Sequence, residues 1–148
     1  EEADDKAAKS LWRKLADFGW DETTTPTASA RISLAPTDTK QVLNNRSLTP
    51  DGLESAIVCH PAHGTILVNW YAEEAANSNA SMMEALQKSR DVAGRLNGTA
   101  VFEHCPADAK SSFDVWGEVG DTLRLMRNMK EQYDPTGTLN PGRFVGGM

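Results

Sequence analysis

The chain has 148 residues, of which 39% are hydrophobic and 24% are charged, and its formal net charge is −6. A chain of this length fits one domain and buries roughly two-thirds of the surface that its unfolded form exposes. The negative charge argues against nucleic acid and anionic membranes as partners, and no apolar run approaches the roughly 18 residues of a membrane span.

The first predicted element is an amphipathic helix over residues 3–18. Its apolar stripe, at a helical spacing, comprises Ala8, Leu11, Trp12, Leu15 and Phe18. The stretch that follows, GWDETTTPT, has no hydrophobic period and predicts a loop or linker. We therefore expect residues 1–27 to form an N-terminal helix and linker before the main domain.

Four strands and two helices are predicted next. Alternation in SARISLAP predicts a half-buried strand that Pro36 stops, and a short helix follows over residues 37–45. The turn TPDG leads into two strands, LESAIVCH and GTILVNWYA, which PAH joins as a hairpin. A capping box formed by Ser81 and Glu84 predicts the start of the longest helix, which stops at Asn97-Gly98. TAVFEHC is the fourth strand.

A last helix precedes a turn-rich tail. It is predicted from Val119, Leu123, Met126, Met129 and Tyr133, and Asp134-Pro135 ends it. In the tail, NPGR suits a type II turn with Pro141 and Gly142 at its two central positions. The order β-α-β-β-α-β predicts an α+β, ferredoxin-like sandwich, in which helices cover one face of an antiparallel sheet. One extra helix then flanks this unit at each end.

Several residues of metal-binding type lie near the second and fourth strands. They are Cys59, His60, His63, His104 and Cys105. Their spacing matches no zinc signature, and these two strands are opposite edges of a ferredoxin-like sheet, roughly 14 Å apart. We therefore predict no metal site, with a metal or reactive thiol as the less favoured alternative. Two cysteines are also too few for a disulfide framework and indicate a reduced, cytoplasmic setting.

The two faces of the predicted sheet differ in chemistry. The face that the helices are expected to cover holds Ile32, Leu34, Ile66, Val68 and Trp70. The opposite face holds Arg31, Ser33, Asn69 and Tyr71, with Thr99 and Glu103 joining them from the fourth strand. This second face is either an ordinary solvated surface or a polar lid over a ligand, in which Arg31 binds a carboxylate.

The C-terminal stretch LMRNMKEQYDPTGTLNPGRFVGGM carries a family resemblance. It resembles the end of the FAD-linked oxidases of the vanillyl-alcohol-oxidase / p-cresol-methylhydroxylase type, in which a helix with a Lys runs into DP…G.LNPG. The form NPGRFVGG, with Val115-Trp116-Gly117 upstream, is most similar to the FAD-binding subunit of glycolate oxidase. ARISLAP is similar to a strand of that subunit, with Ala30 where the family often has Trp.

The resemblance implies a two-part parent protein, with an N-terminal flavin-binding domain and a C-terminal cap domain whose sheet covers the flavin ring. Residues 28–148 resemble the cap domain alone, and the sequence has no GxGxxG, GxxxxGK[ST] or GxSxG motif. We therefore expect a fragment that is inactive alone and whose FAD is bound mainly by an upstream domain. The parent reaction is expected to be the flavin-dependent oxidation of a 2-hydroxy acid such as glycolate.

The resemblance also implies roles for particular residues and partners. Arg31, Ser33 and Asn69 are expected to bind substrate, and Tyr71 and His60 are the candidates for the catalytic base. The turn formed by Asn140, Pro141, Gly142 and Arg143 is expected to lie near the flavin. Iron–sulfur and second flavin subunits are the implied partners. The alternative interpretation is a non-enzymatic ferredoxin-like module that binds a small molecule or contacts another subunit.

Overall fold

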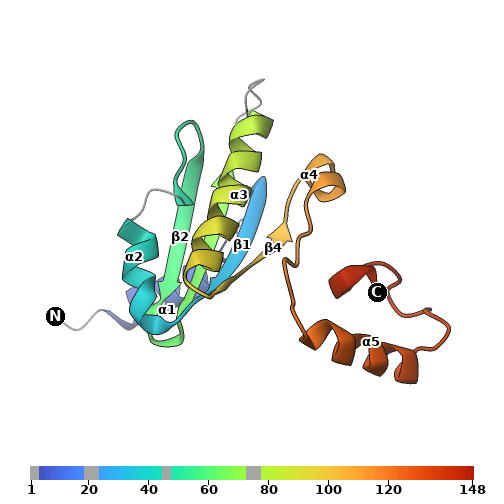
Figure 1. Cartoon of the computed structure of the whole chain (residues 1–148). Coiled ribbons are helices and arrows are strands. Elements are labelled where there is room, and N and C mark those ends of the chain that lie inside the picture. Colours follow the sequence, from blue (N-terminus) through green and yellow to red (C-terminus); the bar gives the residue numbers. More distant parts are fainter. Residues whose placement is uncertain (1–3, 19–23, 45–47, 73–77) are drawn as a thin grey trace. The chain divides into compact units, whose positions relative to one another are not determined.

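The computed structural model describes residues 4–18, 24–44, 48–72 and 78–148 (Figure 1). The chain divides into two compact units, Glu1–Val115 and Trp116–Met148, and each is described by itself. Among the described residues, no helix is both long enough and apolar enough to span a membrane.

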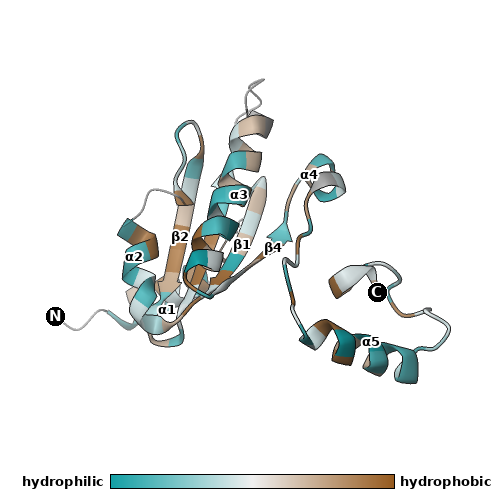
Figure 2. Ribbon diagram, viewed as in Figure 1, coloured by the Kyte–Doolittle hydropathy of each residue, from teal (hydrophilic) through white to brown (hydrophobic). Residues whose placement is uncertain are grey.

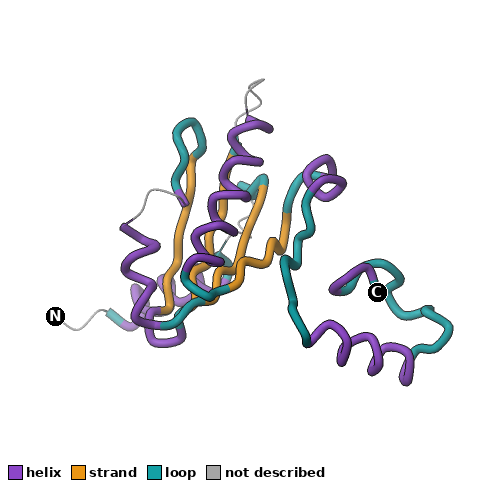
Figure 3. The backbone as a smooth tube through the Cα atoms, viewed as in Figure 1, coloured by secondary structure: helices purple, strands orange, loops and turns teal. Residues whose placement is uncertain are grey.

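The first unit is built on a four-stranded antiparallel sheet with the order β2-β3-β1-β4. Its strands are β1 (Ala28–Ser33), β2 (Glu54–His60), β3 (Thr65–Tyr71) and β4 (Thr99–His104). Its helices are α1 (Asp5–Ala16), α2 (Thr39–Asn44), α3 (Ser78–Arg95) and α4 (Ala107–Ser112). This arrangement, drawn by element type in Figure 3, confirms the predicted ferredoxin-like α+β fold.

The core lies between the sheet and α3, which packs on β1 and β4 (Figure 1). The predicted covered face is confirmed, since Ile32, Ile66, Val68 and Trp70 are fully buried. Opposite them, α3 buries Met82, Ala85, Leu86, Val92 and Ala93. The indole Nε1 of Trp70 donates a 2.9 Å hydrogen bond to the carbonyl oxygen of Leu48, so the largest core side chain has its one polar atom satisfied.

Helix α3 differs from its prediction at one end and agrees at the other. The predicted start at Ser81 is wrong, because the helix is already formed at Ser78 and Ser81 lies inside its first turns. The predicted stop is confirmed: Asn97 has a positive φ of 53°, and Gly98 N donates to the carbonyl of Ala93 at 2.8 Å, as in a Schellman motif.

The short helix α4 is absent from the sequence prediction, and the segment after it makes tertiary contacts. After it, Phe113 packs edge-on against Phe102 of β4, with 5.1 Å between ring centroids. The guanidinium of Arg90, from α3, lies 3.9 Å from the Phe113 ring centroid. The chain after β4 is thus held against the sheet by contacts that a local pattern does not reveal.

Helix α1 carries the predicted apolar stripe but buries none of it. It runs over Asp5–Ala16, two residues shorter at each end than predicted, and Asp4 caps its start. Trp12 on the stripe is 71% exposed, and Leu11 is also exposed.

Figure 2 shows brown apolar segments on the strands of the first unit, where the buried core residues lie.

The second unit consists of α5 (Thr122–Tyr133) and a tail that folds back onto it. The tail ends in a short 3-10 turn, η4 (Val145–Gly147), in which Val145 is buried. A Cβ atom on Gly146 would lie 2.9 Å from Cδ1 of Leu123, so the tail backbone lies directly against α5. Phe144 also packs on Trp116, with 5.9 Å between ring centroids.

Candidate functional site

The sheet face opposite α3, which we call the open face, has an apolar row with one cation in it. Strand register places Val58 opposite Leu67, Leu67 opposite Arg31, and Arg31 opposite Val101. The three apolar side chains are half-buried, and Arg31 is exposed. The row crosses all four strands and places a guanidinium among three half-buried apolar side chains.

Arg31 is held by an ion pair that the sequence alone did not predict. Its Nε donates to Oε1 of Glu103 at 2.8 Å, and the two side chains are 54% and 46% exposed. An exposed pair of this kind contributes only about 0–1 kcal/mol. Among the described residues the pair engages Nε alone, so the two Nη atoms remain able to bind a second carboxylate.

Asn69 is the buried polar residue of the open face. It lies opposite Ser29 and Ala56, diagonally beside Arg31, and is only 4% exposed. Its amide nitrogen Nδ2 is buried without a hydrogen-bond partner in the part of the chain that the structure describes. A buried unsatisfied donor costs about 1–3 kcal/mol.

The two candidate bases lie at opposite ends of the open face. His60 pairs with Thr65 and Tyr71 pairs with Glu54, so the length of β3 from Thr65 to Tyr71 separates them. At about 3.4 Å per residue this is roughly 20 Å. The structure therefore does not bring His60 and Tyr71 together, and one small substrate cannot contact both.

Ser33 also lies toward one end of the open face. It is exposed and stands opposite Thr65 on β3 and Thr99 on β4. Its register position is diagonal to Leu67 and two residues from Arg31 on the same strand. The structure therefore places Arg31, Asn69 and Ser33 on one face, with Arg31 between the other two.

The NPGR segment forms the predicted turn. Arg143 N donates to the carbonyl of Asn140 at 3.1 Å, and Gly142 has the positive φ of 71° that the third position of a type II turn requires. Asn140 itself has a φ of 48°. All four residues from Asn140 to Arg143 are exposed, so this turn presents its side chains outward within the second unit.

Asp134 organises the start of the tail, a role that the sequence analysis missed. Its carboxylate accepts hydrogen bonds from Lys130 Nζ and from the amides of Thr138 and Leu139, the last two at 2.9 Å. Lys130 also donates to the carbonyl of Leu139 at 2.7 Å. The Lys130 bond first, and then the two amides, hold the pKa of Asp134 well below its usual range. The sequence signal for these contacts is local, because Asp134 is followed four residues later by Thr138.

The cysteines and histidines form no metal site among the described residues, where no group of three or more potential ligands comes together. Cys59 and Cys105 are both free, the first half-buried on edge strand β2 and the second buried just beyond edge strand β4. Burial raises the pKa of both thiols, and Lys110 partly opposes that rise at Cys105. Neither thiol therefore has the lowered pKa of a reactive cysteine.

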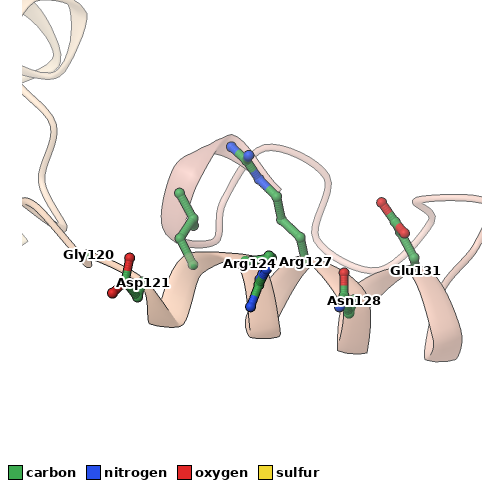
Figure 4. A pocket seen from close by; sticks show the side chains of 7 residues that line it. Gly120, Asp121, Arg124, Arg127, Asn128 and Glu131 are labelled. Atoms are coloured by element: carbon green, nitrogen blue, oxygen red, sulfur yellow. The ribbon is translucent and has the colours of Figure 1, made fainter.

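A depression of about 610 Å³ lies along α5 (Figure 4). Its lining residues are Gly120, Asp121, Leu123, Arg124, Arg127, Asn128 and Glu131. Two arginines and two acidic residues balance, so the depression favours neither anions nor cations. It contains none of the residues that the sequence analysis proposed for a site.

The comparison with protein families finds one described as FAD linked oxidases, C-terminal domain, which matches residues 4–144. This match confirms the resemblance at the level of the family and covers nearly the whole chain. No curated protein and no solved structure matches the chain.

Proposed function

The chain belongs to the family of FAD linked oxidase C-terminal domains, and from this premise we propose that it is the cap domain of an enzyme that oxidises a 2-hydroxy acid such as glycolate. The family makes the chain a domain of a flavin-dependent oxidoreductase and implies FAD as cofactor and an N-terminal FAD-binding domain as partner. The substrate class and the residue roles below are our proposal.

The open face suits a planar ring and a small acid better than it suits a whole dinucleotide. The row of Val58, Leu67 and Val101 gives an apolar surface, and the Nδ2 atom of Asn69 is a buried donor without an acceptor among the described residues. The sequence contains no glycine-rich phosphate loop. We therefore propose that this chain contributes the roof over the ring, while an upstream domain holds the phosphates.

The observation that carries the substrate proposal is the arrangement of Arg31 beside Asn69. A 2-hydroxy acid has a carboxylate and a neighbouring hydroxyl oxygen, which need a cation and a hydrogen-bond donor close together. Arg31, oriented through Nε by Glu103, offers its two Nη atoms to the carboxylate, and Asn69 is an amide donor diagonally beside it on the same face. Ser33 adds a hydroxyl group on the same face.

Catalysis also needs an acceptor for the hydroxyl proton. We assign it to Tyr71 in preference to His60, because Tyr71 is the next residue beyond Asn69 on the open face of β3. A bound flavin supplies the acceptor for the hydrogen that leaves the carbon atom. The part of this chain is then to bind the acid, orient it and remove the proton from its hydroxyl oxygen.

The tail supports the finer assignment. NPGRFVGG is most similar to the end of the FAD-binding subunit of glycolate oxidase, and the Asn140–Arg143 turn is hydrogen-bonded and exposed in the second unit. We propose that this turn contacts the flavin or the domain that holds it. On this assignment, iron–sulfur and second flavin subunits are the partners that take the electrons onward.

Anaerobic spectroscopy of the full-length protein tests the proposal. Glycolate should bleach the yellow flavin absorbance, whereas ethylene glycol, which lacks the carboxylate, should leave it unchanged. In a parallel calorimetric titration, FAD should bind the isolated 148-residue chain weakly or not at all. A flavin that glycolate and other 2-hydroxy acids fail to bleach would refute the substrate class. Tight binding of FAD to this chain would refute the proposal that an upstream domain holds the phosphates.

A further inference from the structure

The two edges of the sheet are protected to different degrees. On the outer side of β4, Phe102 N donates to the carbonyl of Val115 at 2.9 Å, and the β1–β4 register shifts between Ser29 and Ala30. Among the described residues, strand β2 pairs only with β3. In the described parts of the chain, no hydrogen bond joins the outer side of β2 to another segment. One edge is thus covered and irregular, and the other is open and regular.

Strand β2 also lacks the features that usually keep an edge strand from pairing with another chain. Such features are lysine, proline, a bulge or an inward-pointing charge. Between its ends β2 reads Ser-Ala-Ile-Val-Cys, which is uncharged, half-buried and continuous in register with β3. Its only ionisable groups besides Cys59 are Glu54 and His60, one exposed at each end.

We propose that β2 pairs antiparallel with β2 of a second copy of this chain, about a two-fold axis at Ile57. Sheet geometry selects this register. Core-facing residues must oppose core-facing residues, because a slip by one residue would turn the apolar side chains of one copy to the wrong face. Among the registers that remain, only the one centred on Ile57 pairs all residues of Glu54–His60.

Charge complementarity favours a second copy of this chain as the partner of the β2 edge. In this register the carboxylate of Glu54 faces the imidazole of the partner's His60, and symmetry repeats the pair at the other end of the strand. Ala56 faces Val58 on the open side, and Ser55 faces Cys59 on the core side. The pairing joins two four-stranded sheets into one continuous sheet and keeps both cores on the same side.

A single substitution tests the register covalently. In the dimer, Ser55→Cys places a new thiol directly opposite the partner's Cys59, at a Cα separation of about 4.5–5.5 Å that a disulfide accepts. Within one chain the same positions are about 13 Å apart along the strand, so no internal disulfide forms. Mild oxidation of Ser55→Cys should give a covalent dimer, and adding Cys59→Ser or placing the thiol on α3 by Gln87→Cys should abolish it.

An exchange of charges between positions 54 and 60 tests the same contact without a covalent cross-link. His60→Glu opposes like charges at both ends and should raise the dimer dissociation constant about threefold to thirtyfold by sedimentation equilibrium. Adding Glu54→Lys should return the constant to within about threefold of the original. Circular dichroism confirms that the variants fold. A monomer at every concentration, a cross-link that persists without Cys59, or a dimer indifferent to His60→Glu would each overturn the proposal.

Discussion

Gly64 gives the sharpest stability prediction because it stands where the β2–β3 hairpin meets the end of β1. Its φ is +64°, and a Cβ atom built on it would lie 1.9 Å from the carbonyl oxygen of Leu34. Leu34 N also donates to the carbonyl of Gly64 at 2.8 Å, and its side chain is buried in the core. Gly64→Ala must therefore move one backbone segment away from the other.

Gly52 is the matched control, with a φ of +83° and no atom within 4 Å of a built Cβ. There, the positive φ costs about 1–2 kcal/mol, and the lower entropy of the unfolded alanine chain offsets about 0.4–1 kcal/mol. Gly64→Ala adds a lost hydrogen bond of about 0.5–1.5 kcal/mol and overpacking of about 1–3 kcal/mol. We expect it to lower the free energy of unfolding by about 1.5–4.5 kcal/mol more than Gly52→Ala does.

Urea denaturation of both variants, followed by far-ultraviolet circular dichroism, measures this difference. A common slope with denaturant is required, so that the shift in midpoint reports stability alone. Equal stability of the two variants, within about 0.5 kcal/mol, would refute the close approach of the hairpin to β1.

Three further outcomes are expected. Trp70→Phe should lower the free energy of unfolding by about 1–3 kcal/mol, because the buried Leu48 carbonyl loses its donor; an unchanged urea midpoint would contradict this. Because the pKa of Asp134 is lowered in the folded chain, its contribution is complete above the ordinary pKa of about 3.9 and falls as pH drops below it. Amide exchange in residues 134–148 should thus accelerate below about pH 4 relative to the intrinsic rate, and a constant ratio would count against the Asp134 contacts. With a thiol reagent, half-buried Cys59 should react before buried Cys105, and the reverse order would contradict this difference in burial.

The sheet could be predicted from the sequence because the alternation of apolar and polar residues that encodes a strand is local and repetitive. Alternation fixed which side of β1 and β3 faces the core, and Arg31 and Ile32 fell on opposite faces as expected. The strand order followed from the order of elements alone. The turns were equally local, since Asn97 and Gly142 adopt the positive φ values that their positions require.

The rest depended on contacts between segments distant in sequence. The ion pair of Arg31 with Glu103 joins residues 72 positions apart, so neither residue signals the other locally. Asn69 was placed on the right face, but its burial reflects what surrounds it and no periodic pattern encodes that. Ser81 was read as a cap because a capping box is local, while the true start at Ser78 comes earlier.

Replacement of Arg31 in the full-length enzyme tests the central claim most directly, namely that the open face binds a substrate carboxylate. Loss of a charge-assisted contact of about 1.5–3 kcal/mol should lower kcat/KM for glycolate and D-lactate about tenfold to somewhat over a hundredfold in Arg31→Ala. Arg31→Lys should recover only part of this, because lysine acts as a point charge and not as a fork. Arg95→Ala, an exposed arginine on α3, is the control and should leave kcat/KM unchanged. Unchanged kcat/KM in Arg31→Ala at full flavin occupancy would contradict the account and leave the open face an ordinary solvated surface.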